Sequence, residues 1–370
     1  MERLIPVNYP VISKEAKDNV NKALDDCWIS SSGSFVKEFE DKFAKWLGVK
    51  HAIAVTSGTA ALHITLRAMG IGKGDEVIVP AFTMGSCWLA VLYTGATPVF
   101  VDASLKSWCI DTEKIESKIT QRTKAIMPVH IYGQPCGMNK IKDIAEFHGL
   151  KIIEDACEGL GAYYRDKKCG TFGDIACFSF YANKLITTGE GGMVVTNDDY
   201  YAEKLRKLRN LCFTEKRFTH DDIGYNYRMT NLQAAVGVGE MEHIDEYRNK
   251  KFEMANIYNT ILSEVNGVKI PLAVRGTDNI YWMYGILIDE MSFGMSKDEL
   301  KETLRKDFGI DTRDFFYPPE NQPVLKTDEV HINSRYLSRH GLYLPSGLGT
   351  KDEDFEYVAK TIAKLQKNNY

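Results

Sequence analysis

The feature that most constrains the fold is an alternation of two patterns over the first two thirds of the chain. Short runs of Val, Ile and Ala alternate with longer stretches whose apolar residues recur at helical spacing, which is typical of a largely parallel sheet covered by helices. The runs are apolar throughout because both faces of such a sheet are buried. Seven strands are expected at 52–56, 77–80, 97–102, 125–131, 151–156, 176–180 and 192–197, with helices at 59–69, 138–147 and 199–208. We therefore predict an α/β fold with a mostly parallel seven-stranded sheet.

The pattern changes after residues 224–230. Residues 231–258 are expected to form one long helix or two abutting ones. Two apolar runs, VKIPL and YWMYGILI, and a helix over 296–308 follow them, which predicts a smaller α+β domain. The predicted division is a large domain at 1–241 and a C-terminal small domain at 242–370.

Charge and composition exclude several classes of protein. Lys and Arg number 46 and Asp and Glu 50, so the net charge of −4 gives no electrostatic support for nucleic-acid binding or for an anionic membrane partner. Residues 77–101 carry no charge and are long enough to span a bilayer, but their Pro and Gly residues favour a buried strand, helix and strand. The N-terminal segment has no signal-peptide pattern, so a cytoplasmic protein is expected. The eight cysteines form no CxxC pair and are expected to be buried, reduced thiols.

The densest group of unusual residues lies between 151 and 192. Asp155 follows an apolar strand, and Lys184 lies just past another one, in a loop that ends in Gly189, Gly191 and Gly192. Carboxyl ends of parallel strands share one edge of the sheet, where ligands bind in open α/β folds. If each residue is considered alone, the simpler interpretation is that Asp155 caps a helix and that Lys184 is exposed to solvent. Together, the two residues favour an active site.

This pair suits pyridoxal phosphate (PLP), which needs a lysine for a Schiff base and a carboxylate beside the pyridine nitrogen. The cofactor also needs a phosphate cradle. Ser57, Gly58 and Thr59 join a predicted strand to a helix, so their backbone N–H groups and hydroxyls would face an anion at the helix N-terminus. Ser179 could add another hydroxyl. Capping of the helix alone remains the alternative for the Ser-Gly-Thr sequence.

Several motifs along the chain together resemble those of one known family. SGTAAL, GDEVIVPAFT, AIMPVHIYGQ, IIEDACEGLGA, FSFYANKLITTGEGG and GYNYRMTNLQAA occur in an order that resembles the DegT-type sugar-nucleotide aminotransferases, which are fold-type I PLP enzymes. The resemblance implies that Lys184 forms the Schiff base and that Asp155 pairs with the ring nitrogen. It implies a phosphate site made by Ser57, Gly58, Thr59 and Ser179. It also implies that Asn226 reaches the phosphate of a neighbouring subunit, so that a homodimer shares its active sites.

Three departures from the family pattern bear on the substrate. Met84 stands where an aromatic residue usually covers the cofactor ring, and its polarizable sulfur can still do so. Glu158 stands where Gln or His is common near the cofactor's O3′, which resembles the branch that makes perosamine. Pro319 and Glu320 replace a common Pro-Met-His pattern. The residues expected to contact the substrate are Trp28, Ser30, Arg228, Arg313, Tyr317 and Glu320.

The implied reaction moves the amino group of L-glutamate to C4 of a nucleotide-linked 4-keto-6-deoxyhexose and releases 2-oxoglutarate. GDP-4-keto-6-deoxymannose, giving GDP-perosamine, is favoured. A UDP- or dTDP-linked gluco sugar giving a viosamine-type product is the alternative. A PLP-dependent sugar dehydratase, whose relatives carry His at the position of Lys184, and a non-catalytic regulatory relative are weaker hypotheses. His51 and His130 stand alone as core or surface histidines, and no metal is expected.

Overall fold

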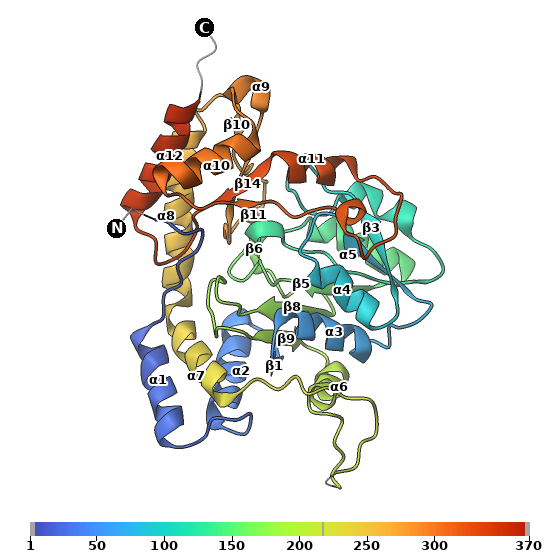
Figure 1. Cartoon of the computed structure of the whole chain (residues 1–370). Coiled ribbons are helices and arrows are strands. Elements are labelled where there is room, and N and C mark those ends of the chain that lie inside the picture. Colours follow the sequence, from blue (N-terminus) through green and yellow to red (C-terminus); the bar gives the residue numbers. More distant parts are fainter. Residues whose placement is uncertain (1–3, 217, 367–370) are drawn as a thin grey trace.

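The large sheet has the predicted strands in a mostly parallel arrangement. In a computed structural model, which describes residues 4–216 and 218–366, the strand order is β1-β9-β8-β5-β4-β2-β3 (Figure 1). The strands are β1 (His51–Val55), β2 (Glu76–Pro80), β3 (Thr97–Val101), β4 (Thr123–Ile126), β5 (Lys151–Asp155), β8 (Ile175–Ser179) and β9 (Gly192–Thr196). Only β9 runs antiparallel to its neighbours, β1 and β8. The predicted seven-stranded α/β sheet is confirmed, although β4 ends at Ile126 rather than at residue 131.

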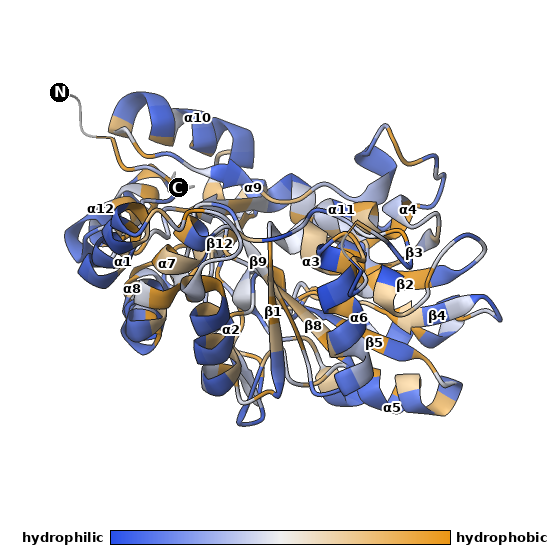
Figure 2. Cartoon of the chain, turned by 90° about the horizontal axis from the view of Figure 1, so that it is seen from below, coloured by the Kyte–Doolittle hydropathy of each residue, from blue (hydrophilic) through white to orange (hydrophobic). Residues whose placement is uncertain are grey.

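Both faces of this sheet are covered by helices. In β1, Ile53 and Val55 belong to one hydrophobic cluster while Ala52 and Ala54 belong to another, as the two-residue repeat of a strand requires. The first cluster includes residues of α3 (Gly58–Ala68), α4 (Ser86–Tyr93), α5 (Met138–His148) and α6 (Asp199–Arg209). The second includes residues of α1 (Lys14–Asp25), α2 (Ser34–Leu47) and α7 (Asn231–Glu240). In Figure 2, hydrophobic colour gathers on the strands, and the surrounding helices carry hydrophilic residues outward.

The uncharged segment 77–101 lies inside this arrangement. It forms most of β2, then α4, then β3, and β2 and β3 pair in parallel. The strand, helix and strand predicted from its Pro and Gly residues are therefore confirmed. In residues 4–216 and 218–366, no helix combines the length and the apolar character that crossing a membrane requires.

The C-terminal part is α+β, as predicted. After α7 a short 3-10 turn, η4 (Met241–His243), leads into α8 (Ile244–Leu262), so the long helical segment is two abutting helices. An antiparallel sheet follows in the order β10-β12-β14-β13. Its strands are β10 (Val268–Lys269), β12 (Tyr284–Ile288), β13 (Arg313–Asp314) and β14 (Gly341–Leu344). The remaining helices are α9 (Glu290–Phe293), α10 (Lys297–Phe308), α11 (Ile332–His340) and α12 (Asp352–Leu365). A small third sheet pairs β11 (Thr277–Asp278) with β6 (Tyr163–Tyr164) and β7 (Lys167–Lys168).

The start of the described chain packs into this C-terminal part. Ile5 forms a parallel bridge with Ile310, and the Ser346 N–H donates to the Val7 carbonyl at 2.8 Å. Ile5 lies in the same hydrophobic cluster as residues of α8, α10 and α12. The spatial grouping thus joins residues from both ends of the sequence, and the division at residue 241 stays a prediction.

The cysteines differ in part from the expectation that all are buried. All eight are free thiols, and six of them are buried. Cys27 is exposed, because it lies in the turn that follows α1, and Cys157 is half-buried beside the site described below.

Candidate active site

The carboxyl ends of β1, β5 and β8 bring the predicted cradle together at one edge of the sheet. Asp155 is the last residue of β5, and Ser179 is the last residue of β8. A Cβ atom on Gly58 would lie 2.8 Å from the Cys157 sulfur and 2.9 Å from the Ser179 Cβ. Only glycine fits there, so the backbone at the start of α3 closely approaches the loop after β5 and the end of β8.

The N-terminus of α3 offers backbone donors to an anion. Ser57 is its N-cap residue and accepts the Ala60 N–H at 3.1 Å. Thr59 and Ser179 are both partly accessible, and the Ser179 hydroxyl oxygen accepts the Tyr181 N–H at 3.3 Å. First-turn N–H groups have no partner within their own helix, and the helix dipole favours negative charge beside them. Capping and anion binding are therefore compatible here.

Lys184 lies in the loop after β8, with its amine against an aromatic ring. Its Nζ is 3.4 Å from the centroid of the Trp282 ring. Burial lowers the pKa of Lys184, and the negative charges of Glu158 and Asp155 oppose this effect. The amine therefore loses its proton more readily than a solvated lysine does, which makes it a better nucleophile and base.

Two buried carboxylates, Asp155 and Glu158, face this amine. The Asp155 side chain is almost wholly buried, and its Oδ1 accepts the Cys157 N–H at 3.1 Å. Burial raises the pKa of Asp155, and the Cys157 N–H and Lys184 work against that rise. Burial also raises the pKa of Glu158 to about 7, despite the nearby charge of Lys184. An amine and two carboxylates thus share one poorly solvated space.

Tyr132 positions Glu158 from the loop after β4. The Tyr132 N–H donates to Glu158 Oε2 at 2.8 Å, and the Tyr132 hydroxyl accepts the Phe316 N–H at 3.3 Å. Its φ of 52° is in the left-handed region, which a non-glycine residue adopts at a cost. Sequence reasoning did not select Tyr132, although it stands in the AIMPVHIYGQ motif that was recognised.

Glu158→Gln should change how the stability of the cofactor-free protein depends on pH. The pKa of Glu158 rises from 4.5 to about 7 on folding, so this group contributes stability that is present below pH 4.5 and is lost as the pH rises through 7. Gln does not ionise, so the free energy of unfolding of the variant, minus that of the wild type, should grow by about 2.5 kcal/mol from about pH 5 to about pH 8. Urea unfolding at several pH values measures this difference.

The control for this prediction is Glu113→Gln, which removes a carboxylate that is 76% exposed. Its difference from the wild type should stay nearly constant over the same pH range, because surface carboxylates contribute little. A constant difference for Glu158→Gln as well would contradict the shifted pKa.

A cavity of about 600 Å³ lies beside the site. Three of the predicted residues, Met84, Arg313 and Tyr317, line it. Trp88, Phe316 and Tyr343 also line it. The Met84 and Tyr317 side chains are about half exposed. The volume lies within the usual range of small-molecule sites, and such aromatic surfaces suit a flat ring system.

The Glu320 carboxylate contacts residues at the start of α11. It accepts hydrogen bonds from the backbone N–H of His331 at 3.1 Å and pairs with the His331 ring at 3.0 Å. It also pairs with Arg335 at 3.3 Å. The contacts that the structure describes for Glu320 therefore fix the segment before α11, and Glu320 is absent from the lining of the 600 Å³ cavity. Its predicted contact with substrate stays a prediction.

Trp28 and Ser30 lie in the loop between α1 and α2. Their backbone carbonyls accept hydrogen bonds from Asn231, at 2.6 Å from its side chain and at 3.0 Å from its N–H. The Trp28 side chain is 57% exposed, and Ser30 is also exposed. The structure does not bring either residue to the cavity with Met84 and Arg313.

Asn226 and Arg228 lie on the segment that precedes α7. The Arg228 Nε donates to the Asn226 side-chain oxygen at 3.0 Å, and its Nη1 donates to Asn210 at 2.8 Å. The Thr56 N–H donates to the Tyr227 carbonyl at 3.1 Å, so this segment runs beside the cradle of its own chain. Asn226 itself is exposed.

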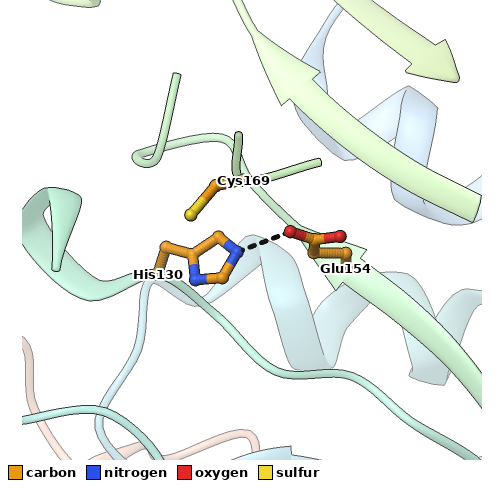
Figure 3. Close-up of side chains that lie close together, drawn as sticks. All are labelled: His130, Glu154 and Cys169. Carbon is orange, nitrogen blue, oxygen red and sulfur yellow. Dashed lines mark hydrogen bonds and ion pairs between the residues drawn. The ribbon is translucent and has the colours of Figure 1, made fainter. Parts of the chain in front are cut away.

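A second buried cluster, His130, Glu154 and Cys169, has residue types that bind metals (Figure 3). The His130 Nδ1 accepts the Cys136 N–H at 3.1 Å, so its Nε2 carries the proton and donates to Glu154 at 2.8 Å. Glu154 also accepts the N–H groups of residues 170, 172 and 173. Four donors occupy the lone pairs of this carboxylate, so the cluster fixes the turn at 170–173 instead of offering ligands to a metal.

The sheet topology and the position of Lys184 after β8 define the class of this protein, which is a fold-type I transferase. The chain belongs to the DegT/DnrJ/EryC1/StrS aminotransferase family, which matches residues 10–363. It is therefore an aminotransferase by family, and the predicted family and enzyme class are confirmed.

Relatives and solved structures agree with this family over nearly the full chain. A protein named GDP-perosamine synthase from Caulobacter vibrioides is 43% identical over 366 residues, covering 98% of each chain. Its namesake from Escherichia coli O157:H7 is 41% identical over 362 residues, covering 97% of this chain and 98% of that protein. The structure of DesV from S. venezuelae, solved in complex with a ketimine intermediate, has a TM-score of 0.90 and 32% identity, covering 98% of this chain and all of that one.

Proposed function

We propose that this chain is a PLP-dependent enzyme that transfers the amino group of L-glutamate to C4 of a nucleotide-linked 4-keto-6-deoxyhexose. GDP-4-keto-6-deoxymannose is the favoured substrate and GDP-perosamine the favoured product. The observation that carries the proposal is the Lys184 amine, held among Asp155 and Glu158 beside the accessible N-terminus of α3. The names of the relatives from C. vibrioides and E. coli support the choice of sugar.

The residues present fit PLP. Gly58 leaves a space that a Cβ would fill, directly beside Ser179, and the N-terminus of α3 suits a phosphate. Asp155 would hold the ring nitrogen, and Lys184 would hold the cofactor covalently. When bound, PLP supplies an aldehyde that condenses with amines and a ring that withdraws electrons.

The chain's own residues divide the remaining work. The Lys184 Nζ, once free, would take a proton from the α-carbon of the amino donor and deliver it to C4′ of the cofactor, because burial keeps a larger share of the amine unprotonated. Glu158 has a pKa of about 7, so it can hold or release a proton near neutral pH. Since Oε2 accepts the Tyr132 N–H, that proton is carried on Oε1.

The 600 Å³ cavity suits the nucleotide part of the substrate. Trp88, Phe316 and Tyr317 offer aromatic surfaces to a base, and Arg313 can hold a diphosphate through two parallel N–H bonds. Lys301 lines the same cavity but is paired with Asp314. Arg313 is therefore the cation that we assign to the diphosphate.

A panel of GDP-, dTDP- and UDP-linked 4-keto-6-deoxy sugars with L-glutamate tests the function. The GDP-linked manno sugar should gain an amino group, scored by product mass, with release of 2-oxoglutarate. Amination of only the dTDP- or UDP-linked sugars would favour the viosamine-type alternative. A relative of this chain, 38% identical over 324 residues, is named dTDP-3-amino-3,4,6-trideoxy-alpha-D-glucose transaminase, so its name gives a dTDP-linked sugar but an amino group at C3 instead of C4. Loss of a hydroxyl without amination would indicate a dehydratase, and no turnover of any sugar would contradict the proposal.

Shared active sites in a homodimer form the second part of the proposal. Asn226 of one subunit would contact the phosphate held by the other. Asn226→Asp places a carboxylate against a phosphate dianion, and we expect this variant to lose cofactor binding and activity. Lys184→Ala is inactive for a different reason. Mixing the two variants under conditions that exchange subunits should restore activity, because one site of each heterodimer then has an intact Lys184 and an intact Asn226.

With complete exchange, half of the dimers are mixed and half of their sites are intact, so about a quarter of wild-type activity should return in a two-fold symmetric dimer. Each variant mixed with itself is the control. The segment beside Asn226 contacts its own chain at Thr56, so the alternative to be tested is that Asn226 acts within its own subunit. If Asn226 acted within its own subunit, every site of the heterodimer would carry a lesion, and verified exchange would restore nothing.

A further inference from the structure

A buried lysine, Lys251, lies close to the site although it has no part in the proposed reaction. It is on α8 and is 2% exposed. Its Nζ donates to the Trp282 carbonyl at 2.9 Å and to the Ser346 carbonyl. No carboxylate faces it among the groups that shift its pKa, which burial alone lowers to about 7. A lysine buried in this way costs free energy, so its contacts need an explanation.

The two carbonyls that Lys251 holds lie at the end of a strand pair. Tyr284 pairs with Leu344 where β12 meets β14, and Trp282 and Ser346 lie two positions outward from this pair. The Tyr284 N–H already donates to the Ser346 side chain at 2.9 Å. Lys251 therefore satisfies two carbonyls at the point where these strands separate, and it fixes the backbone that carries the Trp282 ring.

The Trp282 ring is held on its other sides as well. Its Nε1–H donates to the Asn183 carbonyl at 2.8 Å, directly before Lys184 in the chain. It stacks on Tyr132, with ring centroids 6.3 Å apart. The face of the ring lies 3.4 Å from the Lys184 Nζ. A cation over an aromatic face is stabilised, so the position of this ring affects the proton affinity of that nitrogen.

We propose that Lys251 is a positioning residue for Lys184, acting through the backbone and ring of Trp282. It connects α8, β12 and β14 to the reacting amine without touching that amine. The inference rests on the proposed role of Lys184, and two separate measurements are needed to keep the two claims apart.

The first measurement needs no cofactor. The protein has five tryptophans, so selective labelling gives five indole N–H resonances, and Trp282→Leu identifies the one from Trp282. Lys251→Met keeps the length and apolar stem of the side chain but removes its donors, and it should shift the Trp282 resonance. Lys251→Arg, which keeps charge and donors, should restore it in part. An unchanged Trp282 resonance in Lys251→Met would overturn the proposal.

The matched control is Tyr258→Phe. Tyr258 is also buried on α8, and its hydroxyl donates to the Pro345 carbonyl at 2.8 Å, next to Ser346. This variant removes one buried donor to the same loop without touching Trp282. It should lower the melting temperature and leave the Trp282 resonance unchanged, whereas a purely structural role for Lys251 predicts the same behaviour in both variants.

The second measurement uses the PLP-loaded enzyme and follows the pH midpoint at which the visible absorption of the bound cofactor changes. Glu158, Asp155 and Cys157 face Lys184 and stay the same in every variant. Moving the ring away from the nitrogen should lower this midpoint by about 0.4 to 1.5 pH units. Loss of the Lys251 charge by itself would raise it, because like charges disfavour protonation. The sign of the shift therefore separates positioning from a direct effect of charge.

The double variant completes the test. If Lys251 acts through Trp282, then Lys251→Met in a Trp282→Leu background should add no further shift. We expect kcat of Lys251→Met to fall between about tenfold and a hundredfold, as misplacement of a reacting group does. Additive shifts, or an upward shift in Lys251→Met, would overturn the positioning role. A wild type without Lys184-linked absorption would overturn the proposed function, while the indole resonance would still test the contact.

Discussion

Lys184→Ala should abolish amino transfer. An alanine offers no amine to link the cofactor or to move protons at the α-carbon of the amino donor. The variant should still fold, because the Lys184 side chain contributes no hydrogen bond that the structure describes, and because Asp155 and Glu158 can take up a proton when its charge is lost. Steady-state turnover with the sugar that the substrate panel identifies gives the measurement, with a circular dichroism melt to confirm folding.

Lys168→Ala is a matched control for this prediction. Lys168 also places its amine over a tryptophan, with its Nζ 4.1 Å from the centroid of the Trp46 ring, but outside the site. Its loss should leave turnover nearly unchanged. Borohydride reduction of the wild type followed by peptide mapping should then place the pyridoxyl group on Lys184. Its recovery on another lysine would remove Lys184 from the central role.

Asp155→Asn should lower turnover by at least about a hundredfold, given what a positioned charge contributes in a buried site. The amide keeps the shape of the side chain and can still accept the Cys157 N–H. It no longer carries a negative charge to keep the ring nitrogen of the cofactor protonated. Single-turnover kinetics separate this loss from a change in substrate binding.

Asp102→Asn provides the comparison. Asp102 also follows a parallel strand, β3, but its carboxylate accepts the N–H groups of Asn333 and Ser334 at the start of α11. This variant should lose stability and keep its turnover. Similar turnover losses in both variants would show that the effect of Asp155→Asn comes from damage to the fold.

The sequence predicted the sheet and the proximity of Asp155 to Lys184 for the same reason. Each of Asp155 and Lys184 follows an apolar strand, and parallel strands end at one edge, so a local pattern and one rule of topology bring them together. Gly58 was identified in the same way, from a strand that leads into a helix. These predictions needed only the order of strands and helices along the sequence, and not the positions of side chains.

Contacts between segments that are far apart in the sequence could not be predicted from local patterns. Trp282 and Lys251 meet the site only because β12 and α8 fold back toward it, and neither residue has a local pattern that reports this. Glu320 shows a second limit of such reasoning, since an acidic residue that pairs with His331 has the same sequence appearance as one that contacts a substrate. Trp28 and Ser30 were chosen on resemblance, and the structure places them in a loop held by Asn231.

The bridge between Ile5 and Ile310 also bears on the order in which the protein forms during translation. Ile5 leaves the ribosome long before its partner exists, since about 300 residues separate them, which is about 15 to 60 s of synthesis at common rates. The strands of the large sheet are complete by Thr196 and can pair within that time. The early segment must wait with Ile5 unburied until Leu304, Ile310 and Phe355 arrive. The burial of Ile5 therefore depends on residues that are synthesised last, when the large sheet can already have paired.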